Sequence, residues 1–161
     1  MKKIQLTKQH KPDFEELDEM LCDLNDFLNE ETDFKNKNWT ENLNTILDFQ
    51  DPDGSFKLFD TYKIPGDAIV DFCDIPTYLC TATLIKAYLT NPDAFTLKAK
   101  GCLYNGLKKA SAKNLWGHGF EGLKGQIKAL NIFIKGGLKE FLDLYPDFCP
   151  EFGEMIEKIT A

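Results

Sequence analysis

Residues 75–89, IPTYLCTATLIKAYL, decide the fold, because this segment is apolar on nearly every face of a helix. A helix of that kind belongs in the interior of a protein. Pro76 suits the first helical turn, where its missing N–H has no hydrogen bond to lose. The Thr and Ala side chains are small and let neighbouring helices approach closely. The segment therefore predicts an inner, largely buried helix.

Six further helices are predicted from apolar residues that recur three and four positions apart. The clearest is residues 12–30, which opens with Pro12 and acidic residues, as helix N-termini prefer. In the next helix, residues 39–49, Asn38 or Thr40 is the expected N-cap. The others are residues 93–112, 122–134, 138–144 and 151–159, the last two being short and separated by prolines.

Composition favours one all-α domain that covers residues 1–161. No segment shows the sustained alternation of apolar and polar residues that is typical of a strand. A chain of 161 residues with 43% hydrophobic content can build one substantial core, but not two. Sequence and length together therefore predict a single helical domain.

The charge of the chain indicates which partners are not expected. Its 26 acidic and 19 basic residues give a formal net charge of −7, which repels the phosphates of nucleic acids and anionic membrane surfaces. No stretch approaches the roughly 18 apolar residues of a membrane span, and the first residues lack the apolar core of a signal peptide. We therefore expect an acidic cytoplasmic protein that binds neither nucleic acid nor membranes.

The cysteines also favour a cytoplasmic location. Their number is odd and no two form a C-x-x-C pair, which argues against a disulfide framework and against a zinc ribbon. We expect five reduced thiols, most of them small buried apolar residues. They are Cys22, Cys73, Cys80, Cys102 and Cys149.

Residues 50–56, QDPDGSF, end the predicted helix 39–49 with an abrupt turn. The proline cannot continue a helix, and the two aspartates can bond the amides of their own turn. Gly54 is expected at a positive φ angle, with Phe56 folding back onto the core. Gln50 is expected to bond the carbonyls left free at the helix end. The segment thus predicts a chain reversal between two packed helices.

A helix, then Q-x-P-D-G-S-F, then a Thr- and Ala-rich apolar helix resembles one repeat of the α/α-toroid proteins, the architecture of terpenoid cyclases and protein prenyltransferases. The first copy covers residues 39–89. A degenerate second copy covers residues 93–134, with LWGHGF as its turn. The resemblance implies antiparallel helical hairpins in a partial toroid-like array, flanked by the helix at 12–30 and the short helices at 138–160. The structural residues of the second turn would be Gly117, Gly119 and Phe120.

The catalytic motifs of these enzymes are not matched. Residues 71–74 give only D-F-C-D, in contrast to the D-x-D-D acid motif of the cyclases, and His118 has no identifiable cysteine partner for the prenyltransferase zinc. The predicted helices, about seven, are also too few for a full ring. Neither chemistry is therefore carried over, and no metal site or cofactor is assigned.

Five polar residues form the candidate ligand site: Asp71, Asp74, Tyr78, His118 and Glu121. The glycines beside His118 leave its imidazole exposed, and Glu121 could orient it. The acidic loop at residues 60–74 would suit a cation or a neutral polyol. The simpler alternatives are a solvated glycine-rich turn, a solvated acidic loop and a Tyr78 that belongs to the core.

Two classes of function follow from these observations. The first is a non-enzymatic interaction or oligomerisation module, because an open array of helical hairpins leaves apolar faces that a protein partner or a second copy can cover. The second is a small enzyme or ligand binder, with its site between the loop at residues 67–74 and the turn at residues 117–121. The sequence favours the module.

Overall fold

The computed structural model of the protein describes residues 2–60, 63–65, 68–111 and 123–146, so the predicted helix at 151–159 lies outside it. Within these ranges the chain forms helices and no strand, apart from one isolated bridge between Gln9 and Phe59. The all-α prediction is confirmed. The α-helices are α1 (Phe14–Asn29), α2 (Lys37–Phe49), α3 (Ile75–Thr90), α4 (Leu97–Ser111), α6 (Leu123–Gly136) and α7 (Leu138–Leu144).

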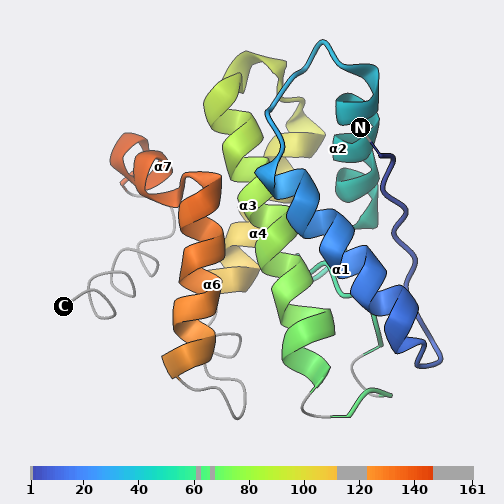
Figure 1. The fold of residues 1–161 in the computed structure, drawn as a ribbon. Coiled ribbons are helices and arrows are strands. Elements are labelled where there is room, and N and C mark those ends of the chain that lie inside the picture. Colours follow the sequence, from blue (N-terminus) through green and yellow to red (C-terminus); the bar gives the residue numbers. More distant parts are fainter. Residues whose placement is uncertain (1, 61–62, 66–67, 112–122, 147–161) are drawn as a thin grey trace.

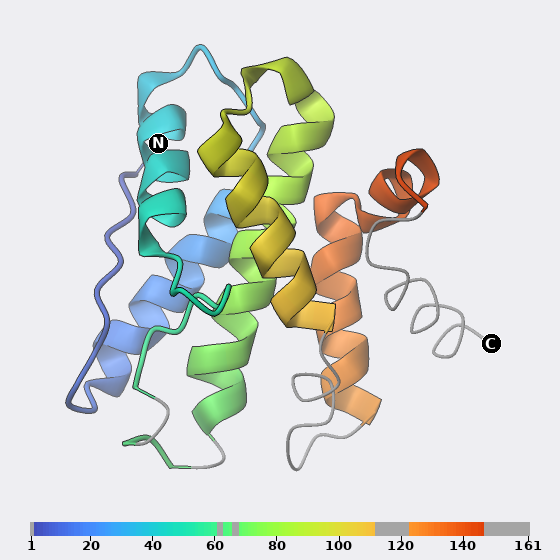
Figure 2. The same ribbon diagram turned by 180° about the vertical axis from the view of Figure 1, so that it is seen from behind.

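Helix α3 is the inner element that its composition predicted. Twelve of its sixteen residues are buried, and α1, α4, α6 and α7 all contact it. Helix α1 crosses one side of α3 (Figure 1), whereas α4 lies on the opposite side (Figure 2). A π-helical turn, Val70–Asp74, leads into α3. Helices α1, α4, α6 and α7 therefore pack against one central helix.

Helix α6 approaches α3 closely because Gly136 lacks a side chain. A Cβ atom at Gly136 would lie 2.4 Å from the backbone oxygen of Ala82 on α3. The backbone of α3 cannot give way as a flexible side chain could. Gly101 on α4 is the opposite case, because a Cβ atom there would meet nothing within 4 Å.

We expect Gly136→Ala to lower the free energy of unfolding by about 1 to 3 kcal/mol, because it overpacks the contact between α3 and α6. Gly101→Ala is the matched control and should raise the free energy of unfolding by about 0.5 to 1 kcal/mol, since alanine is the better helix former and the space is open. Chemical denaturation of both variants measures the difference. Equal effects of the two substitutions would contradict the close approach at Gly136.

The N-terminal segment packs in a way that the helical pattern did not indicate. Asn42 of α2 is buried, and its side chain accepts a hydrogen bond from the Ile4 amide (3.0 Å) and donates one to the Lys2 carbonyl (2.9 Å). Further along, the Gln9 amide donates to the Leu58 carbonyl at 2.8 Å. One amide side chain thus ties an extended segment to a helix, and Ile4 becomes part of the core.

The starts of α2 and α4 differ from the sequence prediction, and in both cases the reason is the capping residue. Asn36 caps α2, since its side chain accepts from the amides of Asn38 and Trp39; Asn38 and Thr40 are therefore not the cap. Helix α4 begins at Leu97 rather than at residue 93. Its first turn is set by the side chain of Thr96, which accepts from the amide of Ala99 at 3.1 Å.

The turn at residues 50–56 matches its prediction in two respects and differs in one. Gly54 has a φ of +91°, and Phe56 is fully buried. The expected bond from Gln50 to the end of its own helix is wrong. Its amide group instead donates to the carbonyls of Gly54 (3.2 Å) and of Cys102 on α4 (2.9 Å). The side chain therefore joins the turn to α4, which the local sequence does not indicate. Phe120, at the second predicted turn, lies outside the described residues.

The four cysteines within the described residues are free thiols, as predicted; Cys149 lies outside this part of the chain. Cys73, Cys80 and Cys102 are buried, but Cys22 is exposed. The prediction of a buried Cys22 is wrong, because the buried face of α1 passes through Leu17, Leu24 and Leu28 and leaves Cys22 beside it.

Candidate functional site: a groove between α1 and α6

The sequence-predicted ligand residues that the structure describes do not share one environment. Asp71 is half-exposed and lies 3.8 Å from the amino group of Lys128 on α6. Asp74 is 4% exposed. Tyr78 is buried, with its ring 5.7 Å from the ring of Phe133, which favours the alternative that Tyr78 belongs to the core. Burial and the nearby charge of Asp74 raise the pKa of the Tyr78 phenol.

Asp74 is the most unusual of these residues, since its Oδ2 atom is buried and has no hydrogen-bond partner. Burial raises its pKa to about 7, although the positive charges of Lys109 and Lys57 oppose the shift. Near neutral pH the carboxyl group therefore holds a proton in a large fraction of molecules. Asp74 has the properties of a buried acid, not of an exposed acidic rim.

His118, Glu121, Gly117 and Gly119 lie outside the described residues. The site that they were expected to form with Asp71, Asp74 and Tyr78 stays a prediction. Within the part of the chain that the structure describes, no three His, Cys, Asp or Glu side chains gather in a way that could hold a metal ion.

The described residues do form a groove between α1 and α6, with α3 as its floor. Its volume is about 430 Å³, which is within the range of protein binding sites. The floor consists of Ile75 and Leu79, at the N-terminal half of α3. Leu21 of α1 and Ile132 of α6 are half-buried and form the apolar walls. The two wall helices lie closest at their C-terminal ends and diverge toward the N-terminal end of α3 (Figure 1).

The rims of the groove carry opposite charges. On α1 the exposed rim residues include Asp26 and Cys22, and on α6 they include Lys128 and Lys135. Lys128 lies near Asp71, so that this predicted residue marks one end of the groove. Neither Asp26 nor Lys135 takes part in an ion pair within the described ranges. The groove thus combines an apolar floor with one acidic and one basic side.

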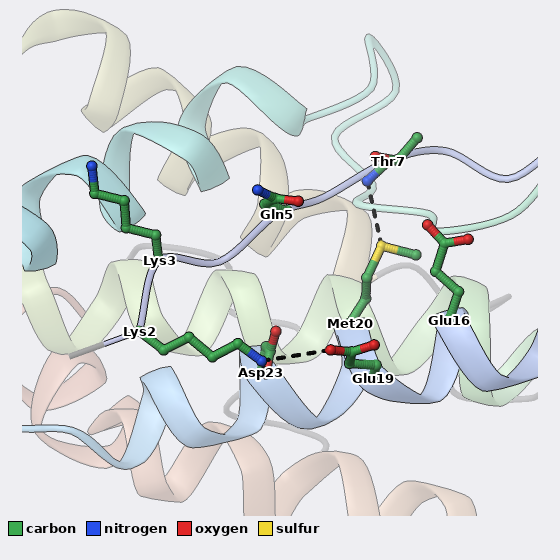
Figure 3. A pocket seen from close by; sticks show the side chains of 8 residues that line it. All are labelled: Lys2, Lys3, Gln5, Thr7, Glu16, Glu19, Met20 and Asp23. Carbon is green, nitrogen blue, oxygen red and sulfur yellow. Dashed lines mark hydrogen bonds and ion pairs between the residues drawn. The ribbon is translucent and has the colours of Figure 1, made fainter.

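A second hollow, of about 290 Å³, lies between the N-terminal segment and α1 (Figure 3). Three of its charged side chains pair with one another: the Lys2 amino group lies 3.2 Å from Asp23 and 3.6 Å from Glu19. The Thr7 amide lies 3.4 Å from the sulfur of Met20. Because these polar groups are satisfied within the chain, the hollow serves the packing of the N-terminal segment better than it serves a ligand.

Comparisons with known proteins do not identify a family: no family model, no curated protein and no solved structure matches this chain. Within the described residues, no helix has the length and apolar character needed to cross a membrane.

Sequence reasoning missed the groove, although part of the signal was present. On α6, residues 128, 131, 132 and 135 recur at the three- and four-residue spacing of one helix face. That spacing indicates a shared face, but it does not indicate that α1 and α3 complete a groove beside it.

Proposed function

We propose that this protein is a cytoplasmic, non-enzymatic interaction module that binds an amphipathic helix of a partner protein in the groove between α1 and α6. The observation that carries the proposal is the apolar floor of Ile75 and Leu79 between two rims of opposite charge. Grooves of this kind accept the apolar face of a helix, while the rims select its polar flanks. The occupant would carry large apolar residues at positions i, i+3 or i+4, and i+7.

The charges of the rims define the partner further. Acidic residues on one flank of the bound helix would face Lys128 and Lys135, and basic residues on the other flank would face Asp26. Complementary rim charges favour one orientation of the helix and penalise the reverse. A helix with the same apolar stripe but basic residues on both flanks would place like charges beside Lys128 and Lys135 in either orientation.

The test uses two designed peptides of about 14 residues, roughly four helical turns, with the same leucine stripe. One has an acidic and a basic flank, which match the rims, and the other has two basic flanks. An environment-sensitive fluorophore on the exposed Cys22 reports binding, after Cys149 has been replaced by serine. We expect the peptide with matched flanks to bind at least about tenfold more tightly than the one with two basic flanks, a difference of roughly 1.4 kcal/mol.

Two isoleucines of α6 supply a matched pair of variants. Ile132 lines the groove, whereas Ile134 is exposed and does not. Ile132→Gln should weaken binding of the matched peptide, and Ile134→Gln should leave it unchanged. Equal affinities of the two peptides, or equal effects of the two variants, would rule out the groove as the binding site.

The hairpin interpretation of the fold belongs to the same proposal. Helices α2 and α3 would form one repeat and α4 and α6 the second, in a partial toroid-like array. The positive φ of Gly54, the burial of Phe56 and the inner position of α3 support the first repeat. An open array of this kind leaves faces for partners, in agreement with an interaction module.

A further inference from the structure

The outer face of α4 exposes large apolar residues on the side of the molecule opposite α1. Leu97 is 88% exposed and Tyr104 is 46% exposed. They lie seven residues apart, which places them on the same helix face, with Gly101 between them. Isolated exposed apolar residues are ordinary in soluble proteins. Here Leu97 and Tyr104 flank Gly101, which has no side chain, so this face of α4 has a notch at Gly101.

Gly101 has no role that packing within the described chain requires. A Cβ atom there would meet nothing within 4 Å, and glycine inside a helix costs about 0.5 to 1 kcal/mol relative to alanine. The other described helical glycine of α4, Gly106, does have such a role, because a Cβ atom would lie 2.6 Å from the Thr81 hydroxyl of α3. Gly101 thus lets a second molecule approach the backbone of α4 from outside.

The charges of α4 indicate what that molecule is. Its sequence, LKAKGCLYNGLKKAS, contains four lysines and no acidic residue, although the whole chain has a net charge of −7. Lys100, at the edge of this face, and Lys108, one turn beyond Tyr104 on the same face, are exposed. Lys98 pairs with Asp48 and Lys109 with Asp53, so the positive charge of the notched face comes from Lys100 and Lys108, and it is complementary to an acidic helix.

Such a helix is present in the chain itself. Helix α1, FEELDEMLCDLNDFLN, has six acidic residues and no basic one. Glu15 and Asp18 are exposed and enter no ion pair among the described residues. Because α1 and α4 lie on opposite sides of α3 (Figures 1 and 2), they cannot meet within one molecule. They can meet between two copies.

We propose that the protein self-associates head to tail, with the α4 face of Leu97, Gly101 and Tyr104 packed against the acidic outer face of α1 in a second copy. The two surfaces of this interface differ, so each copy keeps one free surface of each kind. An interface of that type extends into rings or open chains and does not stop at a dimer. The inference does not depend on the groove between α1 and α6.

Sedimentation velocity tests the proposal over about a hundredfold range of protein concentration, in about 50 mM and about 500 mM salt. In low salt the average mass should rise with concentration beyond that of a dimer. In high salt the average mass at each concentration should be lower, because the facing charges are screened. A monomer at every concentration in low salt would overturn the proposal.

Variants test which surfaces are involved. Gly101→Gln should abolish association without loss of folding, since its space is open within the chain. Lys100→Glu and Asp18→Lys should each be monomeric, and their equimolar mixture should associate again because every α4 face then meets an α1 face of opposite charge. Lys139→Glu on α7 makes the same charge change elsewhere and should associate as the wild type does. Unchanged association of Gly101→Gln, or equal losses in Lys139→Glu and Lys100→Glu, would exclude the α4 face.

Discussion

Replacing Phe56 by alanine will lower the free energy of unfolding by about 3 to 5 kcal/mol, the range for truncating a fully buried aromatic side chain. The Phe56 side chain is 0% exposed and belongs to the main core. Its backbone amide donates to the Thr77 hydroxyl of α3 at 3.0 Å, which holds this end of the turn against the central helix. The surroundings are therefore fixed and cannot collapse easily into the cavity.

Phe14→Ala is the matched control, since Phe14 is 44% exposed on α1 and its ring lies 5.9 Å from the ring of Phe72. Losing that pair should cost about 1 kcal/mol. Urea denaturation of the two variants gives both values. If Phe56→Ala costs no more than Phe14→Ala, then Phe56 does not anchor the turn.

Asp74→Asn will stabilise the protein above neutral pH by roughly 4 kcal/mol, and the gain will vanish near pH 4. Folding raises the pKa of Asp74 from its ordinary 3.8 to about 7. The folded state therefore holds the proton more tightly than the unfolded state does. The stability that the Asp74 carboxyl group contributes is fully present below about pH 4 and is lost as pH rises toward 7. Above pH 7 it changes little. Each pH unit within that window costs about 1.4 kcal/mol.

The measurement is the difference in unfolding free energy between variant and wild type at several pH values from 4 to 8. Taking the difference cancels the titration of the other acids, which both proteins share. Asp71→Asn is the control from the same segment. Asp71 is half-exposed and paired with Lys128, and its difference should stay within about 1 kcal/mol at all pH values. A difference for Asp74→Asn that does not change with pH would show that the carboxyl group is charged and solvated.

Both predictions concern features that the sequence indicated only in part. The burial of Phe56 follows from the turn at residues 50–56, where the proline, the aspartates and Gly54 reverse the chain toward the core. The burial of Asp74 does not follow from any local pattern. Asp71 and Asp74 both belong to the acidic loop at residues 60–74, and the local sequence does not indicate which of them is buried. Because π-helical backbone precedes α3, the two carboxylates have different surroundings, one beside Lys128 and the other inside.

The sequence by itself determined the helical class, the inner position of α3 and the bounds of several helices. Helix α7 spans the residues predicted for it, and α3 differs by a single residue at its end. These features depend on the spacing of apolar residues over a few turns and on prolines at helix ends. That information is local, so a single chain segment contains it.

Only the tertiary structure decided the candidate interaction surfaces. The groove joins residues of α1, α3 and α6 as far apart in sequence as Leu21 and Lys135, and the bond from Gln50 to Cys102 joins a turn to a distant helix. The charge separation between α1 and α4 is visible in the sequence, but the two helices could have been neighbours that neutralise each other. Periodicity shows which face of a helix is apolar. Which other helix covers that face, and which face stays open, depends on how all the helices pack together.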